Sequence, residues 1–317
     1  MNVRSAPPGP ARGLSRRTRL LAIPAVIGTL AVLAGCSSAA PASESESSAP
    51  AVAVNEEARA MLPADIIDSG ELKLVAPFTY PPFIYLDEQQ QMSGSDYEIG
   101  LEIGSRLGLE SNWTRIQSFD ALVPSIENGR FDATFNAMSA TPERAAVVSL
   151  VDYMQSTWTV LVKKGNPAGI DPNDLCGMKS GGTVSSTEVL AMNAISAQCV
   201  ADGKDPIELV TYQTGDQPVA AIASGQIEGY VEFTVRAEDL VKKQPDDFEV
   251  LEADEPVYPP GQLAVIVRPS APGLARAIDA VLQDMYDDGT TARILAENDV
   301  PADSLIAPEI YPGSLQE

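Results

Sequence analysis

Two stretches of the sequence repeat one order of patterns, and this repeat constrains the fold more than any other feature. From Ile126 to Asn136 the chain shows the end of an apolar helical pattern, a glycine stop, an acidic turn and an apolar strand. The same order returns 96 residues later, from Ile222 to Glu232. Helix, glycine and strand follow one another in many proteins, so chance is an alternative explanation. If the repeat is real, it predicts two similar lobes.

Strand and helix patterns alternate along most of the chain. Residues 71–76 alternate in polarity as a strand does, whereas residues 119–126 place apolar side chains three and four positions apart. Thr141 has the character of an N-cap for a further helix. This alternation predicts an α/β architecture. Ligands of open α/β sheets lie beyond the carboxyl ends of strands, so Asn136 and Glu232 would face one shared cleft.

The first 35 residues differ in composition from the rest of the chain. They contain five arginines and no acidic residue, and they include an apolar stretch at residues 20–33. This stretch is shorter than the ~20 residues that cross a bilayer. Such a pattern predicts a secretory signal peptide over residues 1–35. Arg16-Arg17 also suits twin-arginine export, but Arg19 stands where that route takes an apolar residue, so we favour the general route and leave the choice open.

The predicted signal ends in Leu33-Ala34-Gly35-Cys36, which resembles the lipobox of bacterial lipoproteins. That likeness implies cleavage before Cys36 and attachment of a diacylglycerol to it; a chance cysteine after an ordinary signal is the alternative. A diacyl anchor keeps a protein at a membrane without spanning it. Residues 36–60 contain no aromatic residue and predict a flexible tether. We therefore expect a lipid-anchored protein on the extracellular face of the cell membrane.

Charge and the absence of histidine exclude several classes of function. Beyond residue 35, 16 basic and 44 acidic residues remain, a balance of −28. That charge disfavours nucleic acid and anionic membrane surfaces as partners. The chain has no histidine, which excludes Ser–His and Cys–His catalysis and histidine-ligated metal sites. No motif suggests a metal, nucleotide or redox cofactor, so we expect none.

Cys176 and Cys199 are the cysteines left after Cys36. Export places them in an oxidising compartment, which predicts a disulfide between them. Two free buried thiols are the alternative. A loop of this length would stabilise the fold by roughly 3 kcal/mol in the chain-entropy account.

Three stretches carry a resemblance to a known family. Leu74 to Phe83 contains a strand and an aromatic loop, Ser118 to Asp132 a helix and the start of a strand, and Ala137 to Arg144 a turn with an arginine. Together they make the chain resemble bacterial extracellular solute-binding proteins of family 3, the polar amino-acid binders of ABC importers; weaker likeness extends to about Glu297. The resemblance implies the type II periplasmic-binding-protein fold, with two hinge-linked α/β lobes around central mixed sheets.

The same resemblance implies how the chain is divided. Lobe 1 would comprise residues 61–154 and 264–317, and lobe 2 residues 159–258. The hinges would lie at residues 155–158 and 259–263. On its composition, the Pro-rich tail from Pro301 is expected to be irregular.

A carboxylate-binding turn is the next implication of the resemblance. Arg144 would clamp a ligand carboxylate, beside the turn that contains Ala137 and Ser139. A planar bidentate cation and backbone N–H groups near a helix start suit a carboxylate. A solvated charge in the first helical turn is the alternative for Arg144, although the helix dipole disfavours a cation there.

Four further residues match ligand-contacting positions of the family. Tyr80 and Phe119 would line the site as aromatics, with the Tyr80 hydroxyl as a polar group. Ser186 and Thr187 would belong to a lobe 2 loop that contacts the carboxylate. Core packing is the alternative for Phe119, and N-capping is the alternative for Thr187.

The chain departs from the family pattern at two places. Pro77 and Phe78 stand where relatives that take basic or amide side chains often carry an acidic residue. Phe233 stands where the family has an aspartate that pairs with the α-ammonium, and Glu232 precedes it. Side chains alternate along a strand, so we expect one of the two to face the ligand and to decide its class.

The expected function is binding without catalysis. The resemblance implies a monomer that captures a small carboxylate-bearing solute, an amino acid or a derivative, and passes it to an ABC permease. One alternative is a dehydratase acting on cyclic acids on the same fold, with Glu232 or Asp152 as general acid. Another is a sensor or interaction lipoprotein.

Overall fold

The computed structural model describes residues 53–315 of the chain. The predicted signal peptide and the lipid-attachment residue Cys36 lie outside the described residues. Within residues 53–315, every helix is too short or too polar to cross a bilayer.

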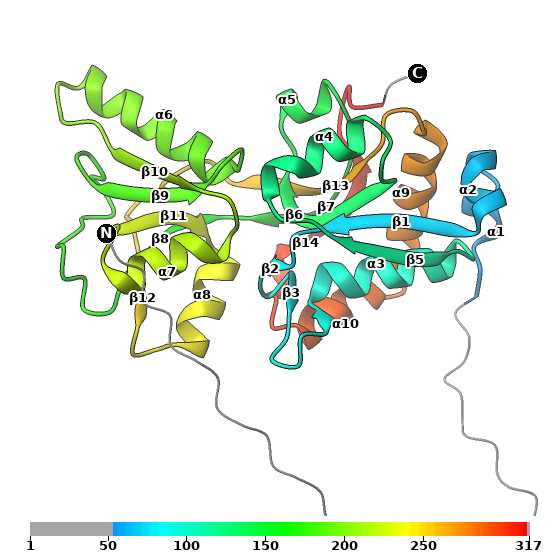
Figure 1. Ribbon diagram of the computed structural model, residues 1–317, viewed down its shortest axis with the longest axis horizontal. Helices are drawn as coiled ribbons and strands as arrows, with labels where there is room; N and C mark the ends of the chain where they lie inside the picture. Colours follow the sequence, from blue (N-terminus) through cyan, green and yellow to red (C-terminus); the bar gives the residue numbers. More distant parts are fainter. Residues whose placement is uncertain (1–52, 316–317) are drawn as a thin grey trace, which may run out of the picture. The chain divides into compact units, whose positions relative to one another are not determined.

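The first sheet contains six strands in the order β14-β7-β13-β6-β1-β5 (Figure 1). β1 pairs in parallel with β5 and β6, whereas β13 pairs antiparallel with β6 and β7. The sheet is therefore mixed, and its parallel pairs need helical crossovers, as in βαβ units. The strands are β1 (Glu71–Ala76), β5 (Glu110–Arg115), β6 (Ala133–Ser139), β7 (Ser149–Ser156), β13 (Gly261–Val267) and β14 (Leu305–Ile310).

Helices cover both faces of this sheet, because side chains of a strand alternate between the faces. Leu74 of β1 belongs to one buried cluster with Ile103 of α3, whereas the next residue, Val75, belongs to a second cluster with Leu122 of α4. We call this sheet with its helices the first lobe. Its helices are α1 (Glu56–Arg59), α2 (Ala64–Ser69), α3 (Ser95–Arg106), η1 (Phe119–Ala121), α4 (Leu122–Glu127), α5 (Pro142–Ala145), α9 (Pro272–Asp287), α10 (Thr290–Glu297) and η2 (Ala302–Ser304).

A small three-stranded sheet follows β1 and presents the aromatic loop. It consists of β2 (Thr79–Tyr80), β3 (Ile84–Leu86) and β4 (Met92–Ser93), all paired antiparallel. The carboxyl ends of β1 and β6, which are neighbours in the large sheet, lead into Tyr80 and Arg144, respectively. The topology thus brings the aromatic loop with Tyr80 close to the segment that contains Arg144.

The second sheet contains five strands in the order β10-β9-β11-β8-β12. β9 pairs in parallel with β10 and β11, and β8 pairs antiparallel with β11 and β12. We call this sheet with its helices the second lobe. Its elements are β8 (Trp158–Lys163), β9 (Lys179–Thr183), α6 (Thr187–Ala201), β10 (Glu208–Tyr212), α7 (Asp216–Ser224), β11 (Gly229–Phe233), α8 (Thr234–Lys243) and β12 (Phe248–Leu251).

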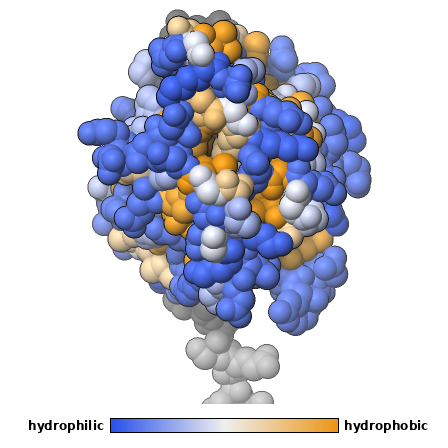
Figure 2. Space-filling view, turned by 90° about the vertical axis from the view of Figure 1, so that its left-hand side faces the viewer, coloured by the Kyte–Doolittle hydropathy of each residue, from blue (hydrophilic) through white to orange (hydrophobic). Residues whose placement is uncertain are grey.

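The surface of the second lobe is mainly hydrophilic. Figure 2 shows this side of the structure, where hydrophilic residues cover most of the face and hydrophobic residues form separate patches. Leu190 and Val200 of α6 are among the exposed large apolar residues. Scattered apolar residues of this kind are ordinary on a soluble surface.

Two segments connect the lobes. The chain passes from β7 to β8 at Thr157, and it returns from β12 to β13 through residues 252–260. The Trp158 Nε1–H donates to the carbonyl oxygen of Pro259 at 3.0 Å, so the two connections lie side by side.

The structure corrects the predicted tether at its carboxyl end. Residues 56–59, which we assigned to a flexible tether, form helix α1. The Asn55 side chain caps this helix by accepting from the Ala58 N–H at 2.8 Å, and Ala58 is fully buried. Asn55 also donates to Asp284 at 2.6 Å. The cap and these contacts with α9 outweigh the polar composition of the segment.

The structure also corrects the predicted irregular tail. Residues 305–310 form strand β14, which pairs antiparallel with β7 at the edge of the first sheet. Pro308 lies within this strand. A proline lacks the N–H of a ladder bond, yet an edge strand tolerates it.

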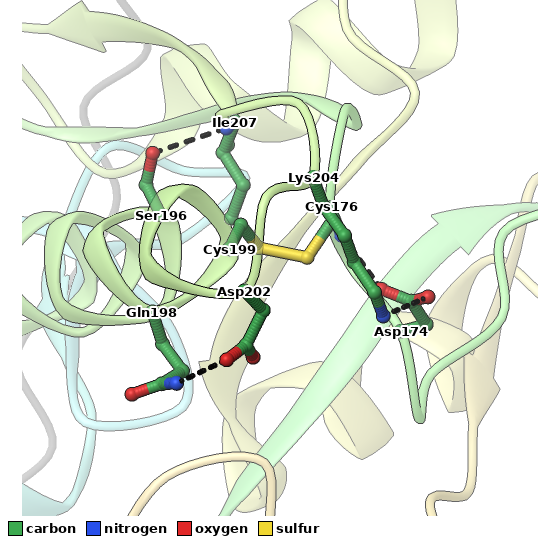
Figure 3. Close-up of a disulfide and its surroundings, with 8 residues drawn as sticks. All are labelled: Asp174, Cys176, Ser196, Gln198, Cys199, Asp202, Lys204 and Ile207. Carbon is green, nitrogen blue, oxygen red and sulfur yellow. Dashed lines mark hydrogen bonds and ion pairs between the residues drawn. A yellow bond between two sulfur atoms is a disulfide. The ribbon is translucent and has the colours of Figure 1, made fainter.

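Cys176 and Cys199 form a disulfide with an S–S distance of 2.05 Å, which confirms the predicted pairing (Figure 3). Cys199 lies in the last turn of α6, and Cys176 lies in the loop before β9. Around the disulfide, the Ser196 hydroxyl accepts from the Ile207 N–H at 3.1 Å, and Lys204 pairs with Asp174 at 2.7 Å. The disulfide therefore attaches the carboxyl end of α6 to the second lobe.

Candidate ligand-binding site

A cavity lies between residues of the two lobes. The space between its lining atoms is about 380 Å³, open solvent included, and its interior has room for about one water molecule. A larger solute therefore requires the lobes to move apart and close around it. The lining residues are Pro77, Thr79, Tyr80, Phe119, Asn136, Ala137, Met138, Ser139, Arg144, Thr183, Ser186, Thr187, Glu188, Gly215 and Phe233.

Nearly all of the predicted ligand-binding residues line this cavity. The nine that do are Tyr80, Phe119, Asn136, Ala137, Ser139, Arg144, Ser186, Thr187 and Phe233, whereas Glu232 lies behind it. The structure thus brings together residues that are up to 153 positions apart in the sequence. It also adds lining residues that the sequence did not indicate, above all Glu188.

Arg144 is a buried cation that reaches across the cavity. The Thr141 hydroxyl caps its helix by accepting from the Arg144 N–H at 3.3 Å. The guanidinium donates to the carbonyl oxygens of Ser139 at 2.6 Å and of Ser185, in the second lobe, at 3.2 Å. Among the described residues no carboxylate forms an ion pair with it. Burial lowers the pKa of Arg144 to about 10, while Glu188 and Glu143 oppose this shift. The guanidinium is charged at neutral pH and free to take an anionic ligand group.

Glu188 contributes a carboxylate to the same cavity. It lies in the first turn of α6, whose N-cap Ser186 accepts from the Val189 N–H at 3.4 Å. Its side chain is buried, and Glu188 Oε1 lies 3.0 Å from the Tyr80 hydroxyl of the first lobe. Burial and the nearby Glu232 raise the pKa of Glu188, whereas hydrogen bonds from Ser186 and Tyr80 oppose the shift.

Glu232 lies behind the cavity in a buried network. It accepts from the Tyr80 hydroxyl at 2.6 Å, from the Tyr230 hydroxyl at 2.5 Å and from the Phe233 N–H at 2.7 Å. It also forms an ion pair with Arg236, whose side chain is 2% exposed. The Arg236 guanidinium lies 4.1 Å from the centre of the Tyr80 ring, as in a cation–π contact. Glu232 thus has a full set of partners from the protein itself.

Phe233 is the member of the Glu232–Phe233 pair that lines the cavity. Its ring packs on Trp158, with 4.4 Å between the ring centres. The strand ends at Phe233, which is the N-cap position of α8. An apolar ring therefore occupies the place where the family pattern has an aspartate.

Asp96, which the sequence did not single out as a site residue, positions the backbone beside the cavity. Its carboxylate accepts from the Ala137 N–H and from the Tyr153 hydroxyl, both at 2.6 Å. Ala137 has a φ of 44°, in the left-handed region that non-glycine residues seldom adopt. Burial raises the pKa of Asp96 to about 7, although the two hydrogen bonds oppose this shift. Asp96 thereby fixes the backbone conformation of the last part of strand β6, between Asn136 and Ser139.

Three polar atoms of lining residues have no hydrogen-bond partner within the described part of the chain. They are Thr79 Oγ1, Asn136 Oδ1 and Ser139 Oγ, all buried. A buried polar atom without a partner costs about 1–3 kcal/mol, and most such atoms in folded proteins are satisfied. These three atoms are therefore available to a polar solute.

Comparison with known proteins shows the family of the chain. Bacterial extracellular solute-binding proteins, family 3, match residues 72–298. The chain is 26% identical to the arginine-binding protein ArgT of Corynebacterium glutamicum, covering 76% of this chain and 78% of the relative. It is 24% identical to the L-cystine-binding protein TcyJ of Escherichia coli strain K12, covering 70% of this chain and 80% of the relative.

Solved structures show the same fold. A mutant of the arginine-binding protein ArgBP from T. maritima has a TM-score of 0.65 at 24% identity, covering 74% of this chain and 96% of that one. The ancestral amino acid-binding protein AncCDT-1, described as a precursor of cyclohexadienyl dehydratase, has a TM-score of 0.63 at 22% identity, covering 74% and 97%. The chain belongs to the bacterial extracellular solute-binding proteins of family 3 and has the two-lobe α/β fold of type II periplasmic binding proteins.

Proposed function

We propose that the protein captures an amino acid, or a close derivative, between its lobes and delivers it to an ABC importer. The observation that carries this proposal is Arg144, a buried guanidinium in an interlobe cavity that has no carboxylate ion-pair partner among residues 53–315. Leaving such a charge without a counterion is unfavourable, and a ligand carboxylate relieves that cost. Relatives named for arginine, cystine and histidine support the amino-acid class.

Closure of the lobes would couple binding to transport. The proposed hinges are residues 155–158 and 259–263, between lobe 1 (residues 61–154 and 264–317) and lobe 2 (residues 159–258). Support comes from the two side-by-side connections between the sheets. A monomer that closes on its solute would present a new surface to the permease.

Binding without catalysis is the function that the side chains favour. Neither of the two carboxylates considered as general acids lines the cavity: Glu232 is paired with Arg236, and Asp152 lies in the middle of the first sheet. A general acid must come within hydrogen-bond reach of the group that it protonates.

A thermal-shift panel tests the proposed function. At 100 times its dissociation constant, a ligand should stabilise the protein by roughly 2.7 kcal/mol, which is a rise in Tm of about 5–10 °C for a protein of this size. We expect at least one amino acid to produce such a rise, and its carboxamide to produce none. The proposal fails if no amino acid raises Tm, or if the carboxamide acts as well as the acid.

We further propose that the protein is anchored through Cys36 on the extracellular face of the membrane. The motif Leu33-Ala34-Gly35-Cys36 supports this. Cys36→Ala should shift the protein from the membrane fraction to the soluble or secreted fraction, because the acceptor thiol is lost. Fractionation and a lipid-label assay would measure this. Continued acylation and membrane association of the variant would contradict the anchor.

A further inference from the structure

The charged side chains that line the cavity, within residues 53–315, are one cation and one anion. Arg144 comes from the first lobe and Glu188 from the second. Glu188 opposes the lowering of the Arg144 pKa by burial, yet the two side chains form no direct ion pair. The cavity therefore offers two separated charges of opposite sign to one solute.

The buried ion pair behind the cavity, Glu232 and Arg236, has no net charge. Glu232 is the other carboxylate near Tyr80, but Arg236 pairs with it and the backbone and two hydroxyls take up its oxygens. Phe233, where the family pattern has an aspartate, brings no charge. A second positive group on a solute would consequently find no carboxylate other than Glu188 among the residues that line the cavity.

We propose that the cavity is matched to a zwitterion with one carboxylate, one cationic nitrogen and no further charge, and that Glu188 receives the nitrogen. This inference rests on the proposed function, and it names the solute class: α-amino acids with an uncharged side chain. Asn136 Oδ1 and the Tyr80 hydroxyl are further oxygens for the nitrogen. A dibasic amino acid would bury a positive charge without a partner, which is unfavourable in a closed site.

Calorimetry with the wild-type protein gives the first test. The ligands are a neutral amino acid that scores in the thermal-shift panel, arginine and lysine as dibasic acids, and the deaminated analogue of the neutral acid. The neutral amino acid should bind at least about 10-fold more tightly than arginine or lysine. Equal or tighter binding of either dibasic acid would overturn the inference. Failure of every amino acid to bind would instead overturn the proposed function.

Glu188→Gln gives the second test, with Glu208→Gln as a matched control. Glu208 is an exposed carboxylate of the same lobe and does not line the cavity. Glu188→Gln should weaken the neutral amino acid about 10-fold or more and change the deaminated analogue less than threefold, because only the amine loses its counterion. The control should change neither. A loss shared by both ligands would show a structural role only, and an unchanged affinity for the amino acid would remove Glu188 from the site. Should the variant not fold, the wild-type series decides alone.

Discussion

Arg144→Ala is expected to weaken ligand binding by about 30-fold or more. Truncating one partner of a buried, hydrogen-bonded charge pair typically costs about 2–5 kcal/mol, and about 1.4 kcal/mol corresponds to each factor of ten. Arg144 is 8% exposed and uses the Ser139 and Ser185 carbonyl oxygens to fix its guanidinium. These contacts orient the Arg144 guanidinium before a ligand binds. Isothermal titration calorimetry with the best ligand of the panel measures the effect.

Arg130→Ala is the matched control for this prediction. Arg130 is an exposed arginine of the same lobe that lies over the Phe131 ring, with 5.3 Å between guanidinium and ring centre, and it does not line the cavity. Its loss should change the affinity less than threefold. If Arg144→Ala also changes the affinity less than threefold while circular dichroism shows an intact fold, Arg144 does not bind the carboxylate.

Arg236→Met is expected to lower the free energy of unfolding by about 3–5 kcal/mol. The substitution keeps an apolar stem but removes the counterion of Glu232, which is fully buried. Breaking a buried ion pair from one side leaves an uncompensated charge in the protein interior, and that is the costly case. The variant also loses the hydrogen bond to the Gly215 carbonyl oxygen and the contact over the Tyr80 ring. Urea unfolding at pH 7 measures the difference.

Two companion variants make this prediction specific. Arg293→Met removes a second pair with i,i+4 spacing, Arg293 and Glu297, but both side chains are more than half exposed. It should cost only about 0.3–0.5 kcal/mol. The double variant Glu232→Gln/Arg236→Met should be more stable than Arg236→Met alone, since it leaves neither charge of this pair buried without its partner. Additive losses in the double variant would show that the pair itself is not the cause.

Local signals in the sequence, together with the family resemblance, placed part of the site. The Thr141-Pro142 helix start gave the place of Arg144 directly, because an N-cap and a proline act within one turn. Strand ends were also visible, and they placed Asn136 at the cleft, but the same reasoning placed Glu232 there, and Glu232 lies behind the cavity. Phe233 was indicated by the family resemblance. Helix starts and strand ends depend on residues that are adjacent in the chain, so they can be predicted from the sequence.

Other residues could not be found in this way, because their roles depend on contacts across the fold. Glu188 looks like any acidic residue in a first helical turn, and only the approach of Tyr80 from the other lobe makes it part of a cavity. Asp96 likewise gains its role from Ala137, 41 residues away. Arg236 follows Glu232 by only four positions, but Glu232 lies in strand β11 and Arg236 in helix α8, so their pairing depends on the bend between the two elements.

The disulfide restricts the motion of α6 because it fixes one end of the helix. The first turn of α6 carries Thr187 and Glu188 at the cavity, and Cys199 at its other end is bonded to Cys176 (Figure 3). A helix of 15 residues is about 22 Å long. A tilt of 5° would move a free end by about 2 Å over that length, enough to misplace a carboxylate relative to its ligand. Fixing the distant end restricts such tilting. The oxidised Cys176–Cys199 pair therefore helps to hold the Glu188 carboxylate in position at the opposite end of the helix.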